Sequence, residues 1–124
     1  MTIKDVSFGI YEVAIRVRDL DIAQAFYRDV LGLVEGLRIE ERGMRFLRTP
    51  GDRGMVVLIR EGGEFPSQHY AFGIQEADIE ATVAGLREAG VETADPVFHD
   101  GMPGTSIYFH DPDGHDLEFF APRV

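Results

Sequence analysis

The chain has 124 residues, about the length of one domain, and its composition of 44% hydrophobic and 27% charged residues is that of a globular protein. The formal net charge of −10 argues against nucleic-acid binding, and no apolar run is long enough for a membrane span or a signal peptide, so we expect a cytoplasmic protein without a membrane partner. Because cysteine is absent, disulfides, thiolate metal ligands and a thiol nucleophile are excluded, and histidine and carboxylates remain as candidate metal ligands.

One pattern of residues occurs twice along the chain. The segment Tyr11–Ile15 and the following Asp21 return about 57 residues later as His69–Gly73 and Asp78. Two copies at this period fit neither a solenoid nor a propeller, and they predict two equivalent modules within a single domain, residues 1–124. We place the first module at about residues 8–60 and the second at about residues 67–121. A pseudo-twofold arrangement of the copies would bring Glu12 and His69 into one neighbourhood.

In the first module, apolar and polar residues alternate from Tyr11 to Val17, which indicates a half-buried strand. A helix is expected next, capped by Asp19 or Asp21 and ended at Gly32, where a left-handed residue is favoured. Its apolar stripe is predicted to consist of Ile22, Ala25 and Phe26. Three further strands are expected near Leu33–Ile39, Arg45–Arg48 and Met55–Ile59.

The second module repeats this order, with a strand predicted at His69–Ile74 and a helix that begins at Asp78 and stops at Gly90. The helix is predicted to bury Ile79, Val83 and Leu86. The remaining strands are expected near Pro96–Phe98, Thr105–His110 and His115–Phe120. His110 and His115 flank a predicted turn and are expected to be exposed. The order βαβββ, found twice, predicts an α+β fold.

The helix of each module is expected to cover one face of the sheet, which leaves the other face for function. That other face collects polar and small side chains: Glu12, Ala14, Arg16, His69, Ala71, Gly73, Ser106, Tyr108, His110, Asp116 and Glu118. The small residues among them predict a hollow. The strand Met55–Ile59 is apolar on both faces, and we expect its Val56 and Leu58 to form an apolar wall that contacts the substrate.

Two stretches of the sequence resemble the vicinal oxygen chelate superfamily, which includes glyoxalase I, extradiol dioxygenases, fosfomycin-resistance enzymes and bleomycin-binding proteins. The stretches are Val13–Asp21 running into Ala25–Leu33, and Gly104–Gly114 running into Leu117–Phe119. The resemblance implies two βαβββ modules in a pseudo-twofold arrangement, which form a cupped mixed sheet with the helices on the outer side. It also implies a small-molecule substrate and a homodimer.

In that superfamily a divalent metal ion is held near the start of the first strand and near the end of the last strand of each module. These positions correspond to Glu12, Leu58, His69 and Glu118, and Leu58 cannot bind a metal. The resemblance therefore implies a three-ligand site of Glu12, His69 and Glu118, in which Glu12 stands where most three-ligand members have histidine. Two carboxylates and one imidazole favour Mn²⁺, with Fe²⁺, Zn²⁺, Ni²⁺ and Co²⁺ as alternatives. In a second interpretation, Glu12 is a general base instead of a ligand.

Three more residues are candidates for the same site. The spacing of His99, Tyr108 and Glu118 resembles that of the second-sphere His and Tyr of extradiol dioxygenases, which implies catalytic roles for His99 and Tyr108. Tyr108 shares the predicted face of Glu118 and is expected to hydrogen-bond a substrate oxygen, while His99 lies in a Gly-rich loop that can close over the site. Arg16 is expected to bind an anionic group of the substrate.

Two functional hypotheses follow. The first is a metal-dependent enzyme that chelates two neighbouring oxygens of a small organic substrate, as a dioxygenase or as a lyase or isomerase of the glyoxalase type. The second is a metal-free protein of the bleomycin-resistance type, which binds a drug or antibiotic without chemistry. Leu58 and Glu12 favour the second hypothesis, whereas His69 and Glu118 together favour the first.

Overall fold

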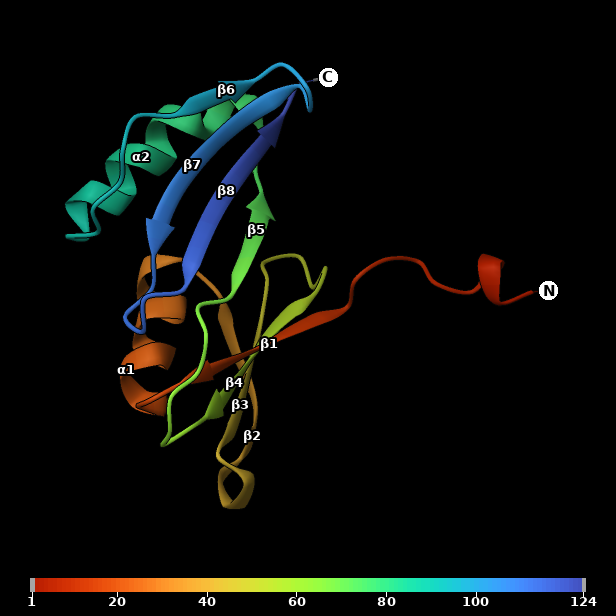
Figure 1. Cartoon of the computed structure of the whole chain (residues 1–124), viewed down its shortest axis with the longest axis vertical. Helices are drawn as coiled ribbons and strands as arrows, with labels where there is room; N and C mark the ends of the chain where they lie inside the picture. The colour runs from red at the N-terminus through yellow and green to blue at the C-terminus, as the bar shows by residue number, and fades with distance from the viewer. Residues whose placement is uncertain (1, 124) are drawn as a thin grey trace. The chain divides into compact units, whose positions relative to one another are not determined.

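The computed structural model describes residues 2–123 of the chain, which divides into two compact units, Met1–Phe65 and Pro66–Val124 (Figure 1). The first unit contains β1 (Glu12–Val17), α1 (Leu20–Ala25), β2 (Val34–Ile39), β3 (Met44–Arg48) and β4 (Met55–Arg60). The second contains β5 (His69–Gly73), α2 (Ile79–Glu88), β6 (Val97–His99), β7 (Gly104–His110) and β8 (Asp116–Pro122). Single 3-10 turns lie at Ile3–Asp5, Glu40–Arg42 and Glu76–Asp78, and a π-helical turn at Phe26–Val30 extends α1.

The two units have the same topology. The first sheet has the strand order β1-β4-β3-β2 and the second has the order β5-β8-β7-β6. In each sheet the first strand pairs in parallel with the fourth, and the other neighbours are antiparallel. The α+β class and the duplicated βαβββ order are therefore confirmed. No helix formed by residues 2–123 has the length and apolar character required to span a membrane.

Helix α1 begins as predicted but buries a different stripe of residues. Asp19 is the N-cap, and its carboxylate accepts a hydrogen bond of 3.0 Å from the backbone N–H of Ile22. The side chain of Ile22 is 59% exposed, so its place in the predicted stripe is wrong, whereas Ala25 and Phe26 are half-buried. The buried positions are Leu20, Ala23, Gln24 and Tyr27, a regular helical stripe in which the polar Gln24 hides the apolar pattern. Gly32 ends the helix with a φ of +79°, as expected.

The register of β4 corrects the predicted apolar wall. Val56 pairs with Val13 and Leu58 pairs with Ile15, so both lie on the face that carries the buried side chains of β1. Arg45 pairs with Leu58 and contacts α1, which identifies this face as the one that the helix covers. Val56 and Leu58 are therefore core residues. Neighbouring residues of a strand point to opposite faces. Val57, which lies between Val56 and Leu58, is therefore the β4 residue on the face of Glu12 and Arg16.

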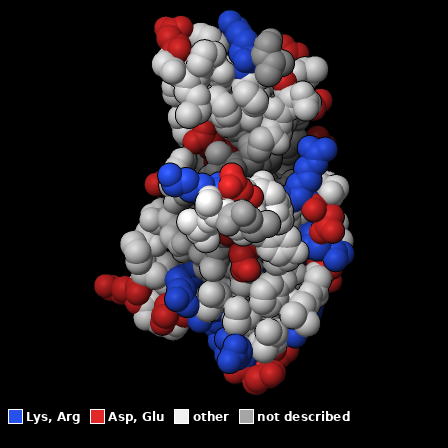
Figure 2. Space-filling model, turned by 90° about the vertical axis from the view of Figure 1, so that its right-hand side faces the viewer, with Lys and Arg blue, Asp and Glu red and all other residues white. Residues whose placement is uncertain are grey.

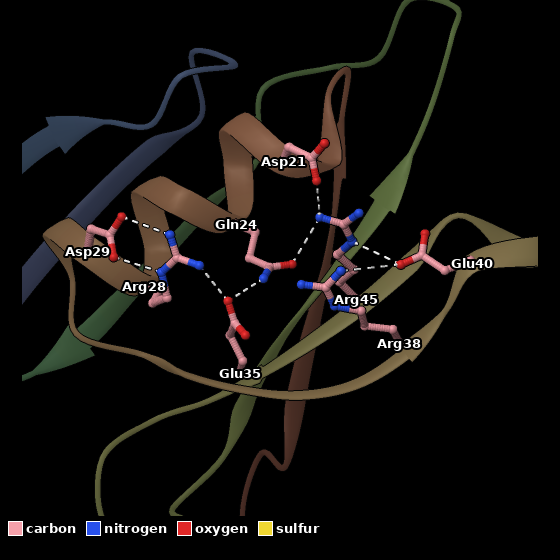
Figure 3. Close-up of polar contacts among 8 residues, drawn as sticks. All are labelled: Asp21, Gln24, Arg28, Asp29, Glu35, Arg38, Glu40 and Arg45. Atoms are coloured by element: carbon pink, nitrogen blue, oxygen red, sulfur yellow. Dashed lines mark hydrogen bonds and ion pairs between the residues drawn. The ribbon is translucent and has the colours of Figure 1, made fainter.

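A buried arginine joins α1 to the first sheet (Figure 3). Arg45 Nη1 on β3 donates hydrogen bonds of 2.6 Å to Asp21 and 3.0 Å to Gln24, and its Nε lies at an ion-pair distance of 3.4 Å from Glu40. The hydrogen bond from Arg45 and the charge of its guanidinium hold the pKa of Asp21 below its ordinary value. The guanidinium is buried because polar groups of the helix and of the Glu40–Arg42 turn surround it.

The same polar network continues to the edge strand β2. Gln24 and Arg28 on the helix both donate to the carboxylate of Glu35, and Arg28 also forms a bidentate pair with Asp29 at 2.7 and 2.9 Å (Figure 3). The hydrogen bonds from Arg28 and from Gln24 lower the pKa of Glu35. The network therefore fixes the position of α1 over β2 and β3 without contributing to the face that carries Glu12.

The second unit packs its apolar residues on the α2 side of its sheet, and Figure 1 shows α2 running along one face of that sheet. Val83 and Leu86 are buried and Ile79 is half-buried, as predicted, and Gly90 ends the helix with a φ of +81°. Three aromatic rings form the centre of this core, with ring centroids 5.6 Å apart for Phe72 and Phe119 and 5.3 Å apart for Phe109 and Phe119.

The turn between β7 and β8 contains one exposed and one buried histidine. His110 is exposed, as expected, and lies 2.7 Å from the Asp116 carboxylate. His115 is 0% exposed, which contradicts the expectation. Its ring Nδ1 accepts a hydrogen bond of 2.9 Å from the backbone N–H of Gln68, and the backbone N–H of His115 donates to the Asp111 carboxylate. His115 is therefore a structural residue that ties the turn to the start of β5.

Candidate metal and substrate site

The register of three strands gathers the candidate residues of the second unit on one face. The parallel pair of β5 and β8 sets His69 opposite Asp116 and Ala71 opposite Glu118. The antiparallel pair of β7 and β8 sets Tyr108 opposite Glu118. Because paired residues of adjacent strands point to the same side, His69, Tyr108 and Glu118 share the face opposite the aromatic core.

His69 and Glu118 form a close imidazole–carboxylate pair. His69 Nε2 lies 3.1 Å from Glu118 Oε1, with the His69 side chain about half exposed and Glu118 buried. His69 Nδ1 lies 2.9 Å from the backbone carbonyl oxygen of Asp116. A carbonyl oxygen only accepts, so Nδ1 carries the hydrogen, and the lone pair of a neutral ring is then on Nε2 and directed at the carboxylate.

This arrangement fits a divalent metal ion. A lone pair on Nε2 facing a carboxylate oxygen is unfavourable unless a proton or a metal cation lies between them. Two ligand atoms bound at right angles, each about 2.1 Å from an ion, are about 3.0 Å apart, which is close to the observed 3.1 Å. A backbone carbonyl on the second ring nitrogen is the usual partner of a metal-binding histidine, because it fixes the tautomer and the ring orientation. In the second unit, as described through Arg123, no third His, Asp or Glu joins the pair in a metal-binding group.

Ser106 and His99 hold the other side of the Glu118 carboxylate. Ser106 Oγ, which is buried, donates a hydrogen bond of 2.6 Å to Glu118 Oε2. His99 Nε2 lies 3.0 Å from Ser106 Oγ and 3.2 Å from the Tyr108 hydroxyl. Because Ser106 gives its only hydrogen to Glu118, the contact with His99 requires His99 Nε2 to donate to Ser106. The predicted residues His99 and Tyr108 are thus connected to Glu118 through Ser106.

The sequence analysis did not assign Ser106 a role beyond that of a small residue on the polar face. A signal was present, because Ser106 precedes Tyr108 by two positions on a strand and therefore shares its face. A small polar residue on a strand is usually a packing residue, and only the pairing of β7 with β8 shows that its hydroxyl reaches the carboxylate.

A pocket of about 630 Å³ opens beside this hydrogen-bonded group. Its polar lining includes His99, Ser106, Tyr108 and Glu118, and its apolar lining includes Phe98, Met102 and Phe120. The volume is typical of pockets for small organic ligands. Tyr108 is 42% exposed, so its hydroxyl is accessible to a molecule in the pocket.

The first unit carries the remaining candidates. Glu12 and Arg16 are exposed on β1, and both lie on the face away from α1. The structure thus brings His69, His99, Ser106, Tyr108 and Glu118 together in the second unit, and the participation of Glu12 and Arg16 in their site stays a prediction. On the face shown in Figure 2, basic and acidic side chains are interspersed and do not form a single basic field of the kind that binds nucleic acids.

Two βαβββ units of one topology, with an imidazole–carboxylate pair on the open face of the second sheet, define a duplicated α+β protein. Residues 9–119 match the model of the Glyoxalase/Bleomycin resistance protein/Dioxygenase superfamily, and the chain belongs to that superfamily. The resemblance found in the sequence is therefore confirmed.

Several known proteins are similar to the chain. The glutathione transferase FosA of Serratia marcescens is 33% identical over 116 residues, which cover 89% of this chain and 78% of that protein. An integron cassette protein from the mobile metagenome of Halifax Harbour sewage outfall has a solved structure with a TM-score of 0.90 and 38% identity, covering 93% of this chain and 99% of its own. A mutant of the fosfomycin resistance protein FosX of Listeria monocytogenes, complexed with Mn(II) and 1S,2S-dihydroxypropylphosphonic acid, shares the fold at a TM-score of 0.77 and 22% identity, with 95% of each chain covered.

Proposed function

We propose that the protein is a metal-dependent transferase or hydrolase that acts on a small organic substrate through two neighbouring oxygen atoms. The observation that carries this proposal is the His69–Glu118 pair, whose 3.1 Å separation and fixed histidine tautomer suit a shared divalent ion. The similarity to a glutathione transferase and to a fosfomycin resistance protein favours group transfer or hydrolysis over the dioxygenase, lyase and isomerase reactions that the family resemblance also implied.

In this proposal Glu12, His69 and Glu118 hold the ion, and Mn(II) is favoured because two carboxylates prefer a hard cation and because the FosX complex contains it. A bound divalent ion would polarise a substrate oxygen and stabilise the negative charge that develops there. Glu12 has the alternative role of a general base, and Arg16 is the candidate substrate-binding residue of the first unit.

The residues around the pocket have separate tasks. The Tyr108 hydroxyl, which is exposed to the pocket and 3.2 Å from His99 Nε2, donates a hydrogen bond to a substrate oxygen. His99 holds Tyr108 and Ser106 in place, and Ser106 fixes the Glu118 carboxylate. The apolar part of the substrate packs against Phe98 and Phe120 and thereby excludes water from the reacting atoms.

A metal-free binding protein for a drug or antibiotic is the second candidate function. The observation that favours it is the pocket itself, since Phe98, Met102 and Phe120 provide an apolar surface that can bind a ligand without an ion. In this case ligand affinity would be unchanged by a chelator, whereas the enzyme proposal requires that the chelator weaken it.

We also propose the homodimer that the family resemblance implies. The N-terminal segment 2–11 supports it, because the side chains of Ile3, Phe8 and Ile10 are each more than 80% exposed. Figure 1 shows this segment extending away from the sheet of its own unit. Exposed apolar residues along one segment indicate an interaction surface, and a second copy of the chain is the partner that would cover it.

Isothermal titration of the metal-free protein with Mn(II) tests the proposed function. We expect one site per chain, with affinity lowered by at least about tenfold in both His69→Ala and Glu118→Gln. His110→Ala is the matched control for His69, because His110 is an exposed histidine that pairs only with the Asp116 side chain in the described contacts. Equal Mn(II) binding by His69→Ala, Glu118→Gln and the wild type would contradict the proposal.

A further inference from the structure

The charge of the chain is concentrated in its second unit. Residues 66–124 contain eleven Asp and Glu but only two basic residues, Arg87 and Arg123, so this unit has a net charge of −9 of the −10 of the whole chain. The pocket therefore belongs to a strongly acidic unit, and any anion that approaches it meets an unfavourable field.

Both arginines of the unit are engaged in other contacts. Arg87 Nη2 donates to the Thr93 carbonyl at 3.1 Å and lies 3.3 Å from the Asp95 carboxylate. The Arg123 guanidinium stacks 4.4 Å from the centre of the Phe98 ring and lies 3.6 Å from the Glu76 carboxylate. The charge of each arginine is thus offset by a neighbouring carboxylate.

The lining of the pocket has the same character. Among the described residues that line it, none is Lys or Arg, and two are the carboxylates Asp100 and Glu118. The remaining residues of the pocket lining are neither acidic nor Lys or Arg, and Phe98, Met102 and Phe120 are the large apolar ones among them. The residues that begin α2 are not part of the lining, so the described part of the second unit offers no α-helix N-terminus to an anion in this pocket.

A phosphonate dianion needs different surroundings. Phosphate-like groups are bound by Arg and Lys, or by backbone N–H groups at a helix N-terminus, because charge-assisted hydrogen bonds must replace the lost hydration. The FosX complex holds a phosphonic acid, and the pocket of this chain lacks the groups that would bind one. Asp100 in its wall would repel such a ligand, whereas the charge of Glu118 is offset by the proposed metal ion.

We propose that the substrate of this protein is an uncharged molecule with two neighbouring oxygens on an apolar body, and that phosphonates are excluded. This inference rests on the proposed function, because the neighbouring oxygens are the atoms that a metal ion would bind. The apolar wall then becomes the main source of affinity in the second unit, and each additional methylene buried against Phe98 or Met102 should tighten binding about fourfold.

Ligand titration of the Mn(II)-loaded protein by calorimetry tests this inference. The probes are fosfomycin and its uncharged dimethyl ester, which share the epoxide and phosphoryl oxygens and differ in charge, together with 1,2-alkanediols of increasing chain length. We expect the ester to bind at least about tenfold more tightly than fosfomycin, and affinity for the alkanediols to rise with length.

Two variants that add the same positive charge sharpen the comparison. Met102→Lys places an ammonium group at the pocket and should raise the affinity for fosfomycin, relative to that for its dimethyl ester, by about tenfold. Ala81→Lys adds the charge at an exposed position of α2 and should shift the ratio less than about twofold, because solvent screens distant charges.

Three results would overturn the inference while leaving the proposed function intact, provided that Mn(II) binds. The first is fosfomycin binding as tightly as its ester, and the second is a failure of both the ester and every alkanediol to bind. The third is strong fosfomycin binding that disappears in Arg16→Ala, which would show that the first unit supplies the missing cation. Absence of Mn(II) binding would instead contradict the proposed function itself.

Discussion

Ser106→Ala removes one buried hydroxyl that donates a 2.6 Å hydrogen bond to the Glu118 carboxylate. A hydrogen bond to a charged group contributes about 1.5–3 kcal/mol, and Glu118 Oε2 would lose this donor in a site from which water is largely excluded. The carboxylate would then be free to rotate away from His69 Nε2. Since loss of an outer-shell partner typically lowers metal affinity by about 10- to 100-fold, we expect a loss of that size for Mn(II).

Electron paramagnetic resonance of free Mn(II) in a titration measures this affinity directly. Ser106→Thr keeps a hydroxyl at the same position and should restore most of the affinity. Thr105→Val is the matched control, because it removes a hydroxyl from the adjacent residue, whose side chain points to the opposite face of β7. If Ser106→Ala binds Mn(II) within twofold of the wild type, Ser106 does not position the Glu118 carboxylate.

Three further predictions concern stability and assembly. Asp19→Ala removes the N-cap of α1 and should lower the free energy of unfolding by about 1 kcal/mol in urea denaturation, whereas an unchanged midpoint would show that the cap is dispensable. Arg45 lowers the pKa of Asp21 below its ordinary value of 3.8, and Arg28 and Gln24 lower the pKa of Glu35 below its ordinary value of 4.5. The two ionised carboxylates therefore stabilise the fold above about pH 4.5, and this contribution is lost as the pH falls through their folded-state pKa values. Urea midpoints measured between pH 3 and 6 should fall towards the acid end, less steeply in Arg28→Gln, and an equal slope in that variant would contradict the assignment. Deletion of residues 2–8 should convert a dimer into a monomer in light scattering after size exclusion, and a deletion variant that stays dimeric would remove this segment from the interface.

The strands and their faces were predictable wherever polar and apolar residues alternate. The alternation in Glu12–Val17 and in Gly104–His110 gave the correct faces for Arg16 and Tyr108, because a strand with one covered face has a side-chain period of two. In Met55–Arg60 every position from Val56 to Leu58 is buried, so the sequence carries no alternation and the choice of Val56 and Leu58 as wall residues failed. Only the pairing with β1 and β3 assigns their face.

Errors of a second kind involve polar residues that are buried with partners distant in sequence. Gln24 belongs to the buried stripe of α1 because Arg45 and Glu35 satisfy its side-chain amide, and the sequence does not reveal those partners. His115 is buried because the Gln68 N–H reaches its ring, and Ser106 reaches Glu118 through strand pairing. Each of these contacts joins residues at least eleven positions apart, so no local pattern encodes them.

Crystallography of the Mn(II)-soaked protein, with anomalous diffraction recorded at the manganese edge, would locate the metal directly. We expect an anomalous peak about 2.1–2.3 Å from His69 Nε2 and from a carboxylate oxygen of Glu118. The backbone carbonyl of Asp116 should still accept the hydrogen bond from His69 Nδ1. A His69 Nε2 that donates directly to Glu118 in manganese-saturated crystals, with no peak between them, would contradict the metal-dependent function.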